Sequence, residues 1–520
     1  MPSYRIIKAI VAAVLLHIGF AGYRLLPVLG DFHPIGFLLP MGELMLVFVL
    51  LSPGTSRKTT TAAALALLSF LVFFGVGEIF YRLIYMEHFS PIYDMQLIPN
   101  FFVMMLQRTG LPAVPIRIAS VIITLAALLA SAYALLILIR ETSRIFLGSR
   151  KMKILVSALA LLFILVAPPF SPSAQTLAAL LHKPEAPALS APPPVEEPTQ
   201  EWNFAAIEDS SIHFVVVESY GAALFQKQEY IPLMSGVYAD LQRLLDEHEL
   251  AVKSGFVRSP AFGGRSWLAD ATILTGVQIE NQKIYDARVA DGERAWWLEL
   301  MQRSGYTCYY VAPGTSQADA QWRYAYPFDV YLLQNDFQYE GPPISFGLTT
   351  DQYLLHEFAA NYLQNDMKQF AFYLLVSAHT PFDRIPVYKE DWQFPLKGRE
   401  YADGYVRYFE NNWLHGNELA EGYIEGMSYS LTSTIHYLTD KVSGKKFMLI
   451  IGDHQPRIPV SGPNPGYPVI FHIIYSQEFH LAFPDSWTLS NALVPPTLPA
   501  NYQDIPEMAA IPSLIEKIIR

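Results

Sequence analysis

The sequence predicts an N-terminal five-helix transmembrane bundle joined to a C-terminal α/β domain, whose mainly parallel sheet is flanked by helices. Two observations predict this architecture. Five apolar stretches, each near the roughly 20 residues that cross a bilayer as a helix, all lie before residue 171. From residue 207 onwards, short apolar runs alternate with amphipathic stretches, which is the pattern of alternating strands and helices.

The composition joins two physical regimes in one chain. Of the 520 residues, 52 % are hydrophobic and the mean hydropathy is +0.23, which is too apolar for a single soluble globule. The net charge of −11 argues against nucleic acid as a partner. The single cysteine, Cys308, allows no intramolecular disulfide and no cysteine-based zinc cluster, and this usage fits a bacterial exported domain.

The transmembrane domain is predicted over residues 1–170. Its apolar stretches cover residues 6–27, 35–52, 61–84, 116–139 and 152–170. The first is not a cleavable signal peptide, because more spans follow and no clean small-residue cleavage site closes it. With the N-terminus in the cytoplasm, nine flanking Lys and Arg residues lie inside and four outside, as the positive-inside rule favours. Five spans then place the rest of the chain outside the cytoplasm, whereas one re-entrant span would invert it.

A linker is predicted over residues 171–206 and an outer domain over 207–520. The linker is rich in Pro, Ala, Ser and Glu, a composition that buries little and behaves as a semi-stiff tether. In the outer domain, strands are expected at 212–217, 250–257, 307–311, 370–376, 447–451 and 469–475. Helices are expected near 231–247, 267–275, 293–303, 350–365, 419–442 and 505–519.

Polar residues lie at the ends of two of the predicted strands. Glu218 ends the apolar run 212–217, and a buried carboxylate there needs either a salt bridge or a metal, because burying it unpaired is costly. Asp453 and His454 follow the run 447–451 and offer one hard oxygen and one borderline nitrogen to a metal. The alternative is an aspartate that caps a turn beside a packed histidine.

A third polar site opens the predicted helix 267–275. The Gly263-Gly264 turn and Arg265 precede Ser266, which is either a capping serine or a nucleophile. The helix N-terminus and the cation of Arg265 would both stabilise negative charge on an attacked phosphate. If Ser266 converges with Glu218, Asp453 and His454, the four form a site for one divalent metal ion, with the serine as both ligand and nucleophile at phosphorus.

The order of these motifs resembles the alkaline phosphatase/sulfatase superfamily. Together with the N-terminal spans it is most similar to the membrane-anchored lipoteichoic acid synthase and phosphoglycerol transferase branch. The resemblance implies a sulfatase-like catalytic domain in which Glu218, Asp453 and His454 hold a Mn²⁺-type metal with the nucleophile, usually threonine and here Ser266. It also implies that substrate is bound by His379, in Ser377-Ala-His-Thr-Pro-Phe382, and by Trp322 and Arg323.

Other residues and two departures bear on the transferred group. Arg384 either meets phosphate or pairs with Asp383. A histidine that the branch carries before its tryptophan has no counterpart in Val311–Thr315, and the segment after His454 is short and proline-rich. A formylglycine sulfatase is disfavoured because neither Ser266 nor Cys308 is followed by x-Pro-x-Arg. Phosphoethanolamine transferases usually carry several cysteines, so the single one disfavours that branch.

The sequence thus predicts a multi-pass enzyme of the bacterial cytoplasmic (inner) membrane, with its N-terminus cytoplasmic and its catalytic domain periplasmic or extracellular. One divalent metal ion, Mn or Zn, activates Ser266, and His379 assists. A phospho-headgroup, phosphoglycerol or phosphoethanolamine, moves from a phospholipid donor to an envelope glycan acceptor. Two alternatives stay open: a phosphodiesterase, phosphatase or sulfatase-like hydrolase with water as acceptor, and a non-catalytic membrane scaffold.

Overall fold

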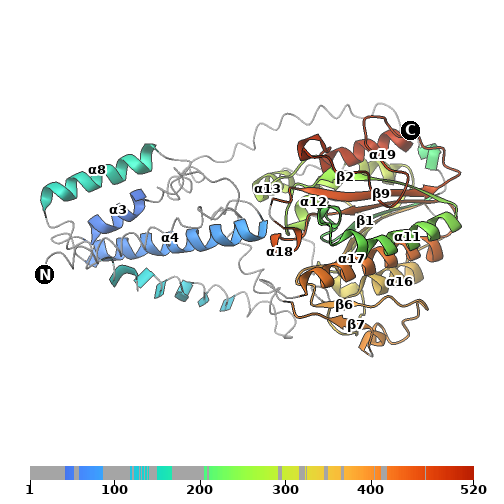
Figure 1. Ribbon diagram of the computed structural model, residues 1–520, viewed down its shortest axis with the longest axis horizontal. Coiled ribbons are helices and arrows are strands. Elements are labelled where there is room, and N and C mark those ends of the chain that lie inside the picture. Colours follow the sequence, from blue (N-terminus) through green and yellow to red (C-terminus); the bar gives the residue numbers. More distant parts are fainter. Residues whose placement is uncertain are drawn as a thin grey trace. The chain divides into compact units, whose positions relative to one another are not determined.

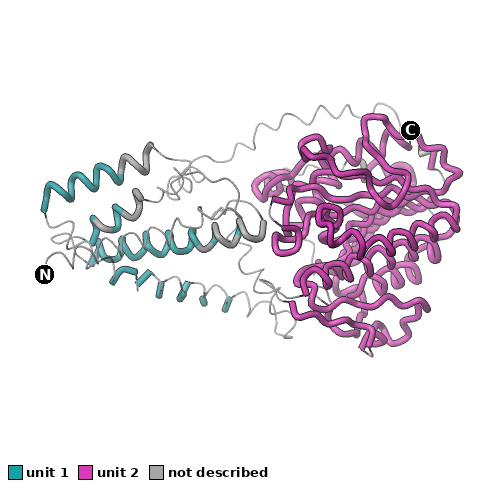
Figure 2. The backbone as a smooth tube through the Cα atoms, in the orientation of Figure 1, with its two compact units in different colours: residues 1–188 teal, residues 189–520 magenta. Residues whose placement is uncertain are grey.

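The computed structural model describes two compact units, residues 1–188 and 189–520 (Figure 2). The described residues are 41–51, 58–85, isolated positions between 118 and 139, 149–166, 204–207 and 210–519. The last range has gaps at 291–295, 316–322, 324, 345–348, 365–367, 403, 412–417 and 463.

The N-terminal unit is helical in its described residues. It contains α3 (Met41–Leu50), α4 (Lys58–Tyr85), α8 (Arg150–Val166) and helical positions between 118 and 139. Apolar side chains from three of these segments, among them Val47, Leu68 and Leu136, form one buried cluster. These segments coincide with four of the five predicted spans, and the first predicted span lies outside the described residues.

One described helix, α4, is long and apolar enough to cross a membrane, through the window Lys58–Gly75. The remaining described helices do not pass that test of length and composition. The five-helix arrangement and the multi-pass topology therefore remain predictions.

The C-terminal unit is built on a seven-stranded sheet in the order β2-β9-β8-β1-β5-β3-β4. The strands are β1 (Ser211–Val217), β2 (Leu250–Arg258), β3 (Thr307–Ala312), β4 (Val330–Leu333), β5 (Gln369–Leu375), β8 (Lys446–Gly452) and β9 (Pro468–Ser476). Strand β9 runs antiparallel to both of its neighbours, and the other neighbouring pairs are parallel. The prediction of an α/β domain with a mainly parallel sheet is confirmed.

Helices cover both faces of this sheet (Figure 1). On one face lie α11 (Ile231–Glu247), α16 (Asp351–Asn361) and α17 (Leu419–His436), and on the other lie α12 (Ser266–Thr275), α14 (Trp296–Arg303) and α19 (Ile511–Ile519). Successive strand residues point to opposite faces, so Val215 packs in the first core and Phe214 in the second. Burial on both faces explains why residues 214–217 of β1 and 447–451 of β8 form continuous apolar runs.

The remaining described elements are short. They are α10 (Ala223–Gln226), α13 (Gln282–Ala290), α18 (Ile458–Ser461), the antiparallel pair β6 (Arg384–Pro386) and β7 (Val406–Tyr408), a π-turn at Tyr437–Lys441, and 3-10 turns at Phe204–Ile207, Gln334–Asp336, Arg399–Ala402, Tyr502–Asp504 and Met508–Ala510.

The six predicted strands each lie within one residue of the observed ones at both ends. The sequence did not predict β4, β6, β7, α13 or the one-turn helices α10 and α18. Strands of three or four residues give too short an apolar run to be distinguished from a loop, and α13 has little separation of apolar and polar faces.

Candidate active site

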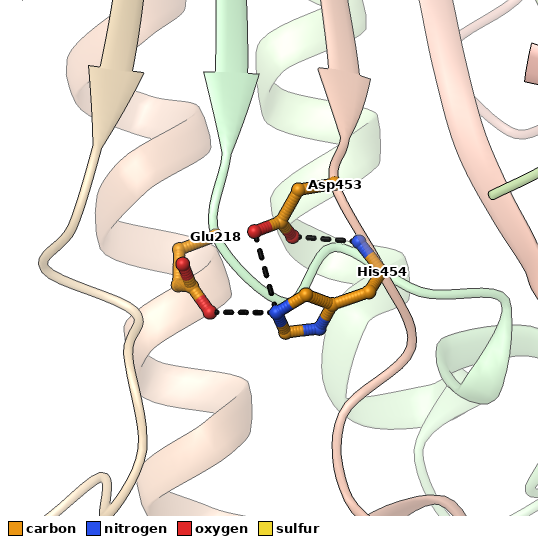
Figure 3. Close-up of side chains that lie close together, drawn as sticks. All are labelled: Glu218, Asp453 and His454. Carbon is orange, nitrogen blue, oxygen red and sulfur yellow. Dashed lines mark hydrogen bonds and ion pairs between the residues drawn. The ribbon is translucent and has the colours of Figure 1, made fainter. Parts of the chain in front are cut away.

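The predicted ligands meet because β1 and β8 are parallel neighbours in matching register. Val217 lies beside Gly452, so the residues that follow, Glu218 and Asp453, leave the sheet at the same edge. Figure 3 shows Glu218, Asp453 and His454 pointing toward one another. Their ligand atoms all lie within 4.8 Å of each other, and all three side chains are buried.

Ser266 reaches this cluster from a constrained turn. Gly263, Gly264 and Arg265 all have positive φ, at 64°, 147° and 63°, before α12 begins at Ser266. The two glycines adopt these values without a steric penalty, but Arg265 is strained there. The turn places Ser266 Oγ 3.0 Å from Glu218 Oε2, to which it donates, and 3.4 Å from His454 Nε2.

Backbone N–H groups hold the carboxylate of Asp453 through one of its two oxygens. Its Oδ1 accepts two backbone hydrogen bonds, each of 2.7 Å, from the N–H groups of Ser219 and His454. Its Oδ2 is buried and accepts no hydrogen bond of normal geometry from the described residues. That oxygen lies 3.4 Å from His454 Nε2, so it faces the centre of the cluster.

The imidazole of His454 is oriented by the backbone. Its Nδ1 lies 2.9 Å from the carbonyl oxygen of Gln455, which accepts only, so Nδ1 carries a proton in either charge state of the ring. The opposite nitrogen, Nε2, then faces Glu218 Oε1 at 3.1 Å. A backbone carbonyl that fixes the tautomer in this way is the usual support of a metal-binding histidine.

Gln455 joins the loops that carry the site, although nothing in its local sequence marks it as a site residue. Its carbonyl oxygen also accepts from Gly263 N–H at 3.0 Å, in the turn before Ser266. Its Oε1 accepts from Ala223 N–H at 2.9 Å, in the segment that follows Glu218. The side chain is fully buried. One residue therefore ties together the three segments that supply Glu218, Ser266 and His454.

His379 approaches the cluster from β5, the other neighbour of β1. Its Nε2 lies 3.9 Å from Glu218 Oε1, and its Nδ1 lies 2.5 Å from the carbonyl oxygen of Thr380. Burial lowers the pKa of His379, the charge of Glu218 partly offsets this, and the charges of His454 and Arg457 lower it further.

The charges of the cluster act strongly on one another. Burial raises the pKa of Glu218, but His379 and His454 outweigh this effect and hold it well below its usual range. Burial, with repulsion from Glu218, raises the pKa of Asp453 to about 7. Burial lowers the pKa of His454, but the two carboxylates outweigh it and raise that pKa to about 9. The site thus favours a positive charge at its centre.

These residues fit a divalent metal ion. Two carboxylates, one imidazole and one hydroxyl are a suitable set of oxygen and nitrogen donors for Mn²⁺ or Zn²⁺. Two observations support the fit: the buried Asp453 Oδ2 accepts no hydrogen bond of normal geometry from described residues, and His454 already has its other nitrogen paired.

Four further residues were predicted to bind substrate. Arg265 is buried at the start of α12. Arg384 Nε lies 3.8 Å from Asp383 Oδ2, and the exposed Arg323 stacks on the ring of Tyr331 at 4.2 Å. Trp322 lies outside the described residues. The roles of these four residues in binding substrate remain predictions.

No protein-family model matches the chain, and no match is found among curated proteins. Solved structures do align with it. The lipoteichoic acid synthase LtaP from Listeria monocytogenes is 18 % identical, with a TM-score of 0.34, over 53 % of this chain and 67 % of that one. The Streptococcus pyogenes phosphoglycerol transferase GacH is 12 % identical, with a TM-score of 0.38, over 60 % and 75 %.

A third such structure is the C-terminal periplasmic domain of EcEptC from Escherichia coli. It is 12 % identical, with a TM-score of 0.34, over 56 % of this chain and 88 % of that one. The names of LtaP and GacH, lipoteichoic acid synthase and phosphoglycerol transferase, are those of the branch that the sequence motifs resemble. At these identities and TM-scores the alignments carry no argument about chemistry, which rests on the residues of the site.

Proposed function

We propose that the C-terminal unit is a metal-dependent phosphotransferase in which Ser266 attacks a phosphodiester of a phospholipid. The observation that carries the proposal is the Ser266 hydroxyl, 3.0 Å from Glu218 Oε2 and 3.4 Å from His454 Nε2 at the start of α12. A hydroxyl beside an acceptor carboxylate, at a helix N-terminus that favours anions, is well placed to attack phosphorus.

The metal would be held by Glu218, Asp453 and His454, with Ser266 beside it. When bound, a divalent ion lowers the pKa of an adjacent hydroxyl and neutralises charge on phosphate oxygens. The chain's own contribution is preorganisation: backbone N–H groups fix Asp453, and the Gln455 carbonyl fixes His454. The ligand atoms therefore face one another before any ion binds.

In the proposed transfer, a bond forms between Ser266 Oγ and phosphorus, and the bond between phosphorus and the diacylglycerol oxygen breaks. That oxygen gains the proton that the serine hydroxyl loses. His379 orients the phosphate, and Arg265, Trp322, Arg323 and Arg384 bind the headgroup. A hydroxyl of an envelope glycan then attacks the phosphoserine, takes the phospho-headgroup, and returns a proton to Ser266 Oγ.

The test is mass spectrometry of the full-length protein in detergent micelles containing phosphatidylglycerol or phosphatidylethanolamine, with Mn²⁺ supplied. We expect a mass gain of one phosphoglycerol or one phosphoethanolamine group, mapped to the peptide that contains Ser266. The Ser266→Ala variant should gain no mass. The control Ser235→Ala, which removes an exposed serine hydroxyl on α11, should gain it as the parent protein does.

Three outcomes would decide against the proposal or redirect it. Lipid turnover by Ser266→Ala at the parent rate would exclude the covalent mechanism, and inert lipid in all variants would favour a non-catalytic scaffold. Release of free phospho-headgroup when no glycan is present would identify water as the acceptor.

A further inference from the structure

We propose that Tyr423 is a positioning residue for the metal site, because its hydroxyl holds the peptide unit that orients Asp453. Tyr423 lies on α17 and touches none of the proposed metal ligands through a hydrogen bond among the described residues. It acts through Ser219, the residue after Glu218. The inference rests on the proposed function for the metal site and adds a residue outside it.

Ser219 makes three contacts at the centre of the site. Its N–H donates to Asp453 Oδ1 at 2.7 Å, and its hydroxyl donates to Glu218 Oε1 at 3.1 Å. Its carbonyl oxygen accepts from the Tyr423 hydroxyl at 3.1 Å. A single residue therefore touches two proposed metal ligands from one side and Tyr423 from the other.

The backbone of Ser219 is strained. Its φ is 61°, in the left-handed region, which a residue other than glycine adopts only with strain. Such a conformation persists only where its surroundings hold it. The short turn to Gly221 N–H, at 2.8 Å, holds the carbonyl from within the same loop. Tyr423 holds it from a separate helix on one face of the sheet.

Tyr423 itself has little freedom to move. Its side chain is fully buried, and its ring packs against the rings of Tyr230 and Phe382, at centroid distances of 6.1 and 5.4 Å. Burial raises the pKa of Tyr423 well above its usual value, so the phenol stays a neutral donor. A buried phenol needs a hydrogen-bond partner, and the Ser219 carbonyl is that partner.

Loss of the Tyr423 hydroxyl should therefore loosen the Ser219 peptide and with it the Asp453 carboxylate. Asp453 Oδ1 has two backbone donors, and the one from Ser219 comes from a different strand end than its own. If the Ser219 N–H is no longer held in place, the Asp453 carboxylate can rotate about its χ2 angle. Its Oδ2 then no longer points steadily at the position of the metal. Residues that orient metal ligands typically contribute 10- to 100-fold to metal affinity.

The test is the affinity for Mn²⁺ of the full-length protein in detergent, stripped of metal by a chelator and titrated by calorimetry. Tyr423→Phe should bind Mn²⁺ about tenfold more weakly than the parent protein. The matched control is Tyr429→Phe on the same helix. It also removes a buried hydroxyl, one that accepts from Gln352 N–H at 3.1 Å and lies 3.1 Å from the Tyr401 hydroxyl. That variant should bind Mn²⁺ within about twofold of the parent.

A second readout reports the Ser219 peptide directly. Hydrogen–deuterium exchange of the segment 217–222, measured without metal, should be faster in Tyr423→Phe and unchanged in Tyr429→Phe. Unchanged exchange and unchanged Mn²⁺ affinity in Tyr423→Phe would overturn the inference, as would an equal loss of affinity in both variants. If the parent protein binds neither Mn²⁺ nor Zn²⁺, the proposed function fails together with the inference.

Discussion

Two groups of buried histidines lie on the same sheet and are held in opposite ways. His213 in β1 and His472 in β9 lie within strands, whereas His454 lies just beyond the end of β8. His213 Nδ1 is 3.2 Å from the Tyr373 hydroxyl, and His472 is 2.6 Å from Ser254 Oγ. The partners inside the sheet are neutral hydroxyls, whereas His454 Nε2 at its edge faces the carboxylates of Glu218 and Asp453.

The partners decide the charge that each histidine prefers. Burial lowers the pKa of both His213 and His472 to about 3, so they are packed as neutral groups. For His454, burial acts in the same direction, but the Asp453 and Glu218 carboxylates outweigh it and raise its pKa to about 9. The interior of the sheet therefore excludes charge, while the carboxyl edge of β1 and β8 attracts a cation.

The largest expected effect is the loss of Mn²⁺ affinity on replacing His454 by glutamine, compared with the same replacement at His472. His454→Gln removes a proposed metal ligand and should weaken Mn²⁺ binding by more than about 100-fold, beyond what changes outside the ligand set cost. His472→Gln should lower thermal stability and leave the Mn²⁺ affinity of the folded protein nearly unchanged. Calorimetric titration of both variants with Mn²⁺ checks this difference, and a large loss of affinity in His472→Gln would break the comparison.

The second prediction tests how closely the backbone segments pack at the carboxyl edge of β1 and β8. A β-carbon at Gly452 would lie 2.0 Å from the backbone oxygen of Tyr220, an atom that cannot move aside cheaply. Gly452→Ala should therefore destabilise the C-terminal unit by about 3 kcal/mol. Thermal unfolding of the full chain in detergent should show a fall in Tm of about 5 °C or more.

The control for this substitution is Gly236→Ala in the exposed part of α11. A β-carbon there meets no atom within 4 Å, and alanine is a better helix former than glycine by about 0.5–1 kcal/mol. The Tm of Gly236→Ala should rise slightly above that of the parent protein. Equal Tm values for Gly452→Ala and the parent protein would show that the strand ends are less rigid than the contacts indicate.

The effect that is smallest near neutral pH is the pH dependence that the interior histidines impart. The folded-state pKa of His472, about 3, lies below the ordinary value of 6.5, so the unfolded chain binds more protons between these values. Stability is therefore complete above pH 6.5 and falls as the pH drops toward 3, by up to about 1.4 kcal/mol per pH unit for one such histidine.

Replacement of His472 by glutamine should make this acid destabilisation shallower by up to that slope. Urea unfolding followed between pH 4 and pH 7 measures it. The control His248→Gln removes an exposed imidazole at the end of α11 and should leave the pH profile as it is. A profile equally steep in His472→Gln and the parent protein would contradict the neutral packing of His472.

The sequence predicted the strands well because burial on both faces leaves a clear signal. The runs at 214–217 and 447–451 are continuously apolar, and a carboxylate follows each within two positions. Glu218, Ser266, Asp453 and His454 could be selected because each stands where an apolar run ends or a helix begins. Gln455, Ser219 and Tyr423 could not, because nothing in their local sequence departs from an ordinary loop or helix.

The sequence by itself determined the division into an apolar and a mixed half, the order of strands and helices along the outer half, and the residue types that could hold a metal. Only the tertiary structure decided that Glu218 and Asp453 leave the sheet side by side. It also decided that Ser219 is strained and that Tyr423 reaches it. The physical reason is that these contacts join residues more than 200 positions apart, through sheet register and helix packing, which no local pattern of residues specifies.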